Sequence, residues 1–66
     1  MKITLNGQPK TVATNSTVTD LLTSLDLADK RVAVEINQTI IPRSQHAQHA
    51  LNEDDVVEIV VAVGGG

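Results

Sequence analysis

The stretch that decides the fold of this chain runs from Val56 to Gly66 and reads VVEIVVAVGGG. Five of its first six residues are β-branched, a composition typical of a strand. Side chains in a strand point alternately to opposite faces, so we expect one set to face the core, namely Val57, Ile59 and Val61. The set expected to face outward is Val56, Glu58 and Val60. We expect this strand to pair in parallel with the first strand of the chain, at the centre of a mixed sheet.

The start of the chain predicts a hairpin. Polar and apolar residues alternate over residues 2–5, and Asn6-Gly7 is a strong two-residue signal for a tight turn between strands. The returning strand is expected over about residues 10–13. We place it at an edge of the sheet, because Pro9 cannot donate a ladder hydrogen bond.

One amphipathic helix is predicted next. Thr17 is suited to cap it, and Asp20 three residues later completes a variant of the capping box. Four apolar residues follow at helical spacing, namely Val18, Leu21, Leu22 and Leu25. This pattern predicts about two and a half turns whose apolar stripe packs on the sheet.

Two further strands complete the expected sheet. Alternation over residues 31–37 predicts a strand near the centre, and Ile40-Ile41 predicts a short strand that Pro42 ends. Residues 43–51 have few apolar anchors and are expected to form a short turn or a single helical turn. The order of elements indicates an α+β fold, a mixed four- to five-stranded sheet with one main helix across one face.

Composition narrows the class of function. Five basic and eight acidic residues give a net charge of −3, and no aromatic residue is available to stack on bases, so nucleic acid is not an expected partner. The absence of cysteine excludes disulfides and a thiol nucleophile and favours a reducing compartment. The first residues lack the apolar region of a signal peptide or membrane span, so we expect a cytoplasmic protein.

The glycines that close the sequence carry the candidate site. Residues 62–66 are expected to form a flexible tail behind a domain of residues 1–61. Because glycine has no Cβ, Gly64 and Gly65 can thread a slot too narrow for other residues. The carboxylate of Gly66 is ionised at neutral pH and must be activated before it accepts sulfur or an amine; attack on the α-phosphate of ATP is the usual route. The alternative interpretation is a frayed chain end.

A partner that receives such a tail must dock beside it. An apolar strip is expected on the outward face from Val56, Val60 and Val63. Acidic residues gather just before and within the last strand, namely Glu53, Asp54, Asp55 and Glu58. We interpret them either as a solvated loop or as an acidic collar that steers a basic partner toward the glycines.

Other site chemistry has no support in the sequence. His46 and His49 have the i, i+3 spacing of a shared metal site, but no cysteine or suitably placed acid completes it, so we interpret both as polar surface. The serines lack a visible base and orienting group, and no glycine-rich phosphate loop is present. We therefore expect no metal and no bound cofactor.

The segment Ile36–Arg43, INQTIIPR, resembles the sulfur carrier proteins of thiamine biosynthesis, the ThiS family. Members of that family carry an Asn-x-x-Ile-Ile-Pro-Arg stretch and end in Gly-Gly. The resemblance extends over the whole chain, including the helix start at Thr17, and implies a ubiquitin-like β-grasp fold. One departure is His46, where relatives often have an aromatic residue.

The resemblance implies a carrier rather than an enzyme. A basic or neutral adenylating enzyme of the ubiquitin-activating type (ThiF-like), which uses ATP and magnesium, would convert the Gly66 carboxylate to an acyl-adenylate. A persulfide donor would then displace AMP and leave a thiocarboxylate, and the sulfur would pass to thiazole synthase (ThiG-like). The chain itself would bind no cofactor.

Three alternatives remain open. The small subunit of molybdopterin synthase also carries a thiocarboxylate on a β-grasp tail, but relatives of that kind usually lack the Ile40–Arg43 stretch. A ubiquitin-like protein modifier would form isopeptide bonds through the same adenylate. An interaction module with a disordered tail would not use its terminus at all.

Overall fold

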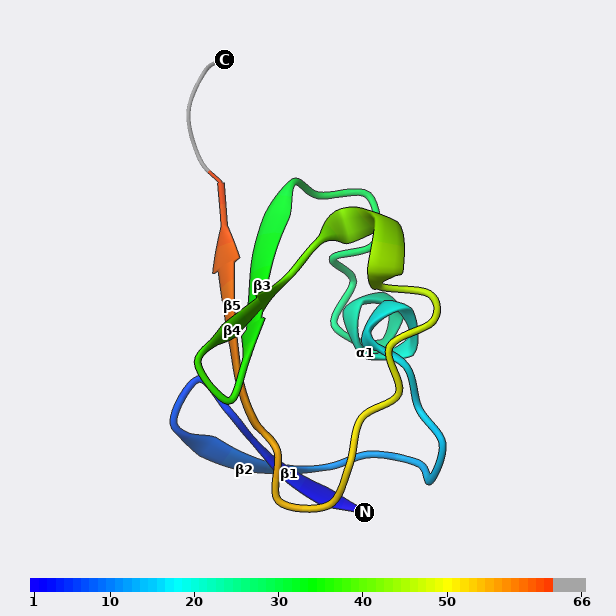
Figure 1. The fold of residues 1–66 in the computed structure, drawn as a ribbon, viewed down its shortest axis with the longest axis vertical. Coiled ribbons are helices and arrows are strands. Elements are labelled where there is room, and N and C mark those ends of the chain that lie inside the picture. The colour runs from blue at the N-terminus through cyan, green and yellow to red at the C-terminus, as the bar shows by residue number, and fades with distance from the viewer. Residues whose placement is uncertain (63–66) are drawn as a thin grey trace.

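A computed structural model, which describes residues 1–62, contains one five-stranded sheet with a single α-helix across one face (Figure 1). The strand order is β2-β1-β5-β3-β4. The strands are β1 (Lys2–Leu5), β2 (Gln8–Thr11), β3 (Val32–Ile36), β4 (Thr39–Ile41) and β5 (Val56–Val61). Helix α1 spans Val18–Ser24, and a single 3₁₀ turn spans Arg43–Gln45.

The centre of the sheet is the parallel pair of β1 and β5, as predicted from the sequence. Thr4 lies beside Val56, and Leu5 lies beside Val57. The other neighbours, β1 with β2, β3 with β4 and β3 with β5, are antiparallel. Because β5 lies between the first strand and the third, it holds the two hairpins of the sheet together.

The core lies between the sheet and α1. Its fully buried members include Ile3, Val18, Leu21, Val34 and Val57. The alternation predicted for β3 and β5 is therefore confirmed over most of each strand.

The predicted core face of β5 is wrong at one residue. Val61 is 38% exposed, because it occupies the last ladder position of β5, where only the half-buried Val32 lies beside it.

Both hairpins turn through asparagine. Asn6 and Gly7 have φ of 49° and 83°, and Asn37 and Gln38 have φ of 51° and 70°. These left-handed conformations suit a two-residue turn, so each ladder resumes at once. The second strand consequently begins at Gln8, two residues earlier than predicted. It is an edge strand, as expected, and its outer backbone groups need no ladder partner, so proline is accepted within it.

Helix α1 begins with the predicted capping box. The Asp20 amide donates to the Thr17 hydroxyl at 3.2 Å, and the Thr17 amide donates to the Asp20 carboxylate at 2.9 Å. The next two free amides are satisfied by the segment after the 3₁₀ turn: Val18 donates to the His49 carbonyl at 3.0 Å, and Thr19 donates to the His46 carbonyl at 3.1 Å. Residues 46–49 therefore serve as a second cap.

The helix is shorter than predicted because it ends in a Schellman-type turn. Asp26 has a φ of 63°, the left-handed conformation that stops a helix. Its amide donates to the Thr23 carbonyl at 3.1 Å, and the Leu27 amide donates to the Leu22 carbonyl at 2.8 Å. Leu25 is thus the C-cap rather than part of a further turn. No helix within residues 1–62 has the length and apolar character needed to cross a bilayer.

Candidate functional site

The sheet face opposite α1 presents the side chains predicted to face outward. Val60 is 65% exposed, and Val56 and Glu58 on the same strand are also exposed. Sequence analysis missed Ile40 on β4, which is 62% exposed. The signal was present in the sequence, because Ile41 is buried and adjacent residues of a strand point to opposite faces. The outer face therefore carries separate apolar side chains on two strands.

Two glutamates lie side by side in the middle of this outer face. Glu35 of β3 is directly opposite Glu58 of β5 in the antiparallel register. Like charges in that position repel each other and reduce the stability of the sheet. A cationic side chain of a docked partner would relieve the repulsion. Glu35 was not singled out in the sequence, because its neighbour became known only with the register.

The structure corrects the interpretation of Asp55 as a surface charge. Its side chain is only 6% exposed. One carboxylate oxygen accepts from the Asn37 side-chain amide at 3.0 Å, and the other accepts from the Asn52 backbone amide at 2.8 Å. Asp55 therefore holds the loop before β5 and is not available to a partner. Glu53 and Asp54 in the same loop are exposed.

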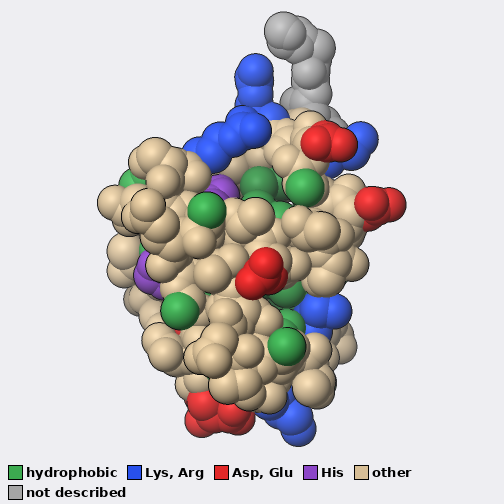
Figure 2. Space-filling view, turned by 90° about the vertical axis from the view of Figure 1, so that its right-hand side faces the viewer, with side chains coloured by type: hydrophobic (Ala, Val, Ile, Leu, Met, Phe, Trp, Pro, Cys, Tyr) green, Lys and Arg blue, Asp and Glu red, His purple; other side chains and the backbone are tan. Residues whose placement is uncertain are grey.

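The acidic loop lies at the opposite end of β5 from Ala62. The loop precedes the strand and Ala62 follows it, so the strand separates them (Figure 1). Six residues of strand span about 20 Å. The residue beside the end of β5 is instead Arg31, whose carbonyl accepts from the Ala62 amide at 2.8 Å. Lys and Arg side chains gather at this same end in Figure 2, with an acidic side chain beside them. The charge around Ala62 is therefore mixed, with basic side chains predominating.

His46 is not surface, contrary to the sequence interpretation. Its side chain is 6% exposed, and Nε2 lies 3.0 Å from the carbonyl oxygen of Ile41. Because a carbonyl only accepts, Nε2 donates and carries the proton. The 3₁₀ turn directs this ring inward, whereas His49 is half-buried. Within residues 1–62 no group of three or more His, Cys, Asp or Glu side chains is placed to hold a metal ion.

The two turn asparagines bind the central strand in the same way. The side-chain oxygen of Asn6 accepts from the Ile59 amide at 2.8 Å, and its side-chain nitrogen donates to the Ile59 carbonyl at 3.3 Å. The side-chain oxygen of Asn37 accepts from the Val56 amide at 3.0 Å. We call these two residues the asparagine clamps. They fix β5, and with it the outer face, from both hairpins.

Of the predicted tail, residues 62–66, the structure describes only Ala62, whose amide donates to the Arg31 carbonyl and which is therefore held by the sheet. The remaining residues, Val63, Gly64, Gly65 and Gly66, lie outside the described part, so the assignment of Gly66 as the modified residue stays a prediction. The structure does locate the point from which these residues continue. Ala62 follows β5 directly at the basic end of the sheet.

Comparison with known proteins identifies the family. The ThiS family model matches residues 3–66. The chain is 38% identical to the sulfur carrier protein ThiS of Escherichia coli K12 over the full length of both chains. The crystal structure of the thiamine biosynthesis protein ThiS from Geobacter metallireducens superposes with a TM-score of 0.84 at 36% identity, again covering both chains completely.

A third relative is much longer. The chain is 42% identical over its whole length to the thiazole synthase of Paramagnetospirillum magneticum, but it spans only 20% of that protein. The full-length matches, together with the five-stranded sheet and single helix, confirm the β-grasp fold and the resemblance seen in the Ile36–Arg43 segment. The chain therefore belongs to the ThiS family.

Proposed function

We propose that this protein is a sulfur carrier of thiamine biosynthesis and that it carries the sulfur on the carboxyl carbon of Gly66. The observation that supports this most strongly is the full-length match to a sulfur carrier of the same size. A carrier needs a folded domain that its partners recognise and a reactive end. The outer face of the sheet would serve for recognition, and Gly66 would be the reactive end.

The chemistry requires partners that supply the catalytic groups. In an adenylating enzyme, the Gly66 carboxylate would attack the α-phosphorus of ATP·Mg²⁺, form the acyl-adenylate and release pyrophosphate. The terminal sulfur of a persulfide would then attack the acyl carbon and expel AMP. A thiol would cleave the resulting acyl disulfide and leave the thiocarboxylate. This chain acts as co-substrate in each step.

The outer face is the part of the body best suited to docking. Val56 and Val60 flank the Glu35–Glu58 pair on the strand that leads directly to the tail. A partner that covers these valines and places a cation near the glutamates would gain apolar burial and relieve the repulsion. The position of the tail relative to that partner would then be set by β5.

Thiazole synthase is the proposed acceptor of the sulfur. Two thiazole synthases contain, within a much longer chain, a segment similar to this whole protein. Covalent linkage of two such parts raises the effective concentration of one for the other, which is useful when the parts act in sequence. We propose that this protein and a thiazole synthase make the same contact as two separate proteins.

The deciding measurement is the intact mass of the protein isolated from its native cell. We expect a fraction in which one oxygen at Gly66 is replaced by sulfur. Gly66 joined to lysines of other proteins would instead favour a protein modifier. Thiocarboxylate delivered to a molybdopterin precursor rather than to thiazole synthase would favour the molybdopterin synthase subunit.

A second measurement tests the role of the free carboxylate. One alanine added after Gly66 should abolish ATP–pyrophosphate exchange by the adenylating enzyme, while the far-UV spectrum stays unchanged. The exposed substitution Gln48→Ala is the matched control and should retain exchange. Normal exchange by the extended variant would contradict the proposal.

A further inference from the structure

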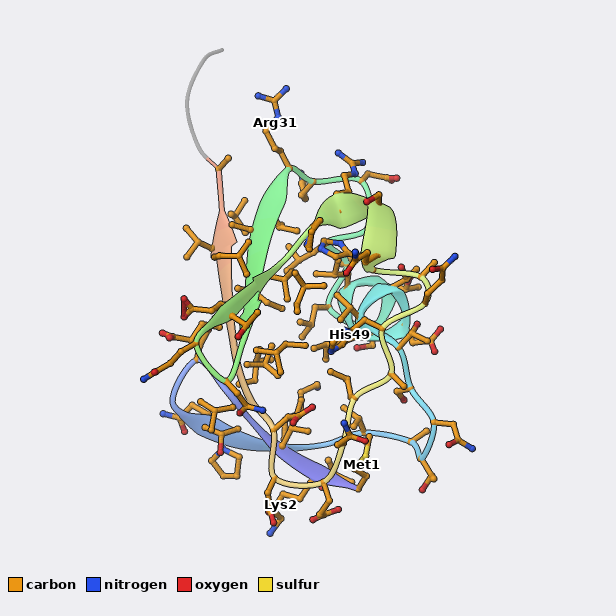
Figure 3. All side chains as sticks on the ribbon, viewed as in Figure 1. Met1, Lys2, Arg31 and His49 are labelled. Atoms are coloured by element: carbon orange, nitrogen blue, oxygen red, sulfur yellow. The ribbon has the colours of Figure 1, made fainter. Side chains whose placement is uncertain are left out.

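Basic residues gather at the end of the sheet from which the tail continues. Three of the five basic residues of the chain, Lys30, Arg31 and Arg43, belong to this end, although the net charge of the protein is −3. Lys2 lies at the opposite end (Figure 3). The local charge therefore has the opposite sign to that of the whole molecule, and it lies where a partner must receive the tail.

Two of these cations line a pocket of about 140 Å³ between α1, the loop before β3 and the 3₁₀ turn. Lys30 lines it from the loop and Arg43 from the 3₁₀ turn. Thr19 and the buried His46 also line the pocket. The two acids of the same loop, Asp26 and Asp29, do not line it. The pocket is therefore positively charged.

The rest of the pocket lining is apolar. Leu22, Val32 and two alanines complete the wall. A free inorganic anion has no apolar atoms to place against such a surface, whereas a glutamate side chain has methylene groups that can pack on it. Its carboxylate would then lie between the guanidinium of Arg43 and the ammonium of Lys30, both of which pair well with carboxylates. The combination favours an acidic side chain as occupant.

The wall that carries Arg43 is held in place before any ligand arrives. The Gln45 amide donates to the Pro42 carbonyl at 2.9 Å, and the His46 amide donates to the Arg43 carbonyl at 3.1 Å. The His46 ring is fixed on the Ile41 carbonyl. The side chain of Arg43 thus starts from a fixed backbone, which lowers the ordering cost of an ion pair.

We infer that this pocket is a docking point for an acidic side chain of the protein that receives the tail, with one glutamate carboxylate bound between Lys30 and Arg43. The identity of that protein rests on the proposed function, but the preference of the pocket for a carboxylate does not. The end of the sheet that carries this pocket therefore recognises an acidic side chain of the partner. The glutamate pair on the outer face recognises a cationic side chain of the partner.

The preference is tested on the isolated protein by ¹⁵N-resolved NMR titration with an end-blocked peptide that contains three glutamates. We expect shifts at Thr19, Lys30, Arg43 and His46. The double variant Lys30→Gln/Arg43→Gln should bind about tenfold more weakly, since two partly exposed ion pairs are lost. The matched control Lys2→Gln/Lys10→Gln removes the same charge elsewhere and should bind like the unmodified protein.

Several outcomes would overturn the inference. These are the absence of shifts at the pocket residues, equal weakening in both double variants, and inorganic phosphate saturating the same residues at a lower concentration than the peptide. A second titration measures association of the same variants with the adenylating enzyme at low salt. If that enzyme fails to bind the unmodified protein while the peptide result holds, the proposed function fails and the pocket assignment stands.

Discussion

Replacing Asn37 by alanine is expected to lower the free energy of unfolding by about 3.5 kcal/mol. The change removes the acceptor of the Val56 amide and the donor to the buried Asp55 carboxylate, both at 3.0 Å. The first loss is worth about 1 kcal/mol, and the second, to a carboxylate, about 1.5 kcal/mol or more. Alanine at a φ of 51° adds strain of about 1 kcal/mol. A domain of this size has only about 3–5 kcal/mol in total.

A glycine at the same position separates the two causes. Asn37→Gly removes the same hydrogen bonds but accepts a positive φ without strain, so it should be more stable than Asn37→Ala by about 1 kcal/mol. Asp55→Ala and the double variant Asn37→Gly/Asp55→Ala complete a cycle that isolates the interaction between the two side chains. We expect a coupling of at least about 1 kcal/mol.

The assay is urea unfolding followed by far-UV circular dichroism, because the chain has no aromatic residue to report by fluorescence. The m-value should stay constant across the variants, since the exposed surface on unfolding is the same. A loss of less than about 1 kcal/mol in both Asn37 variants, or a coupling near zero, would refute the idea that the clamp stabilises β5.

Three further changes test other parts of the structure. Gln38→Gly should raise the free energy of unfolding by about 0.5–1 kcal/mol, because Gln38 has a φ of 70°; a loss in urea unfolding would contradict this. Thr17→Ala should lower it by about 1 kcal/mol through loss of the capping box, and an unchanged midpoint would show that the second cap suffices. Val60→Thr keeps the β-branched shape and adds no charge beside the Glu35–Glu58 pair, so it should change stability by less than about 0.5 kcal/mol, yet weaken binding to the adenylating enzyme in calorimetry. Unaltered binding would remove the outer face from the proposed interface.

Local signals in the sequence predicted the elements well. The capping box at Thr17 depends only on residues three positions apart, and the faces of β5 follow from strict alternation. Both properties are encoded within a few residues, so a sequence pattern is enough to find them. The parallel pairing of the first and last strands joins residues far apart in the chain, and it was predicted from the order of elements.

Properties set by distant partners were missed. Asp55 is buried because Asn37, eighteen positions away in the chain, supplies a donor, and His46 is buried because the 3₁₀ turn folds its ring onto the Ile41 carbonyl. The acidic loop and Ala62 are near in sequence but not in space. An extended strand separates its two ends as widely as a chain can, so Glu53 and Asp54 lie at the far end of β5 from Ala62.

The clamped position of β5 has a mechanical consequence. A partner that pulls on the chain beyond Ala62 applies force along the axis of β5. That strand is bonded on one side to β1, on the other to β3, and to both turn asparagines. These bonds lie across the direction of pull, so they resist in shear and share the load. A partner can therefore draw the protein toward a deep binding site by the end that follows β5, without peeling β5 away from its neighbouring strands.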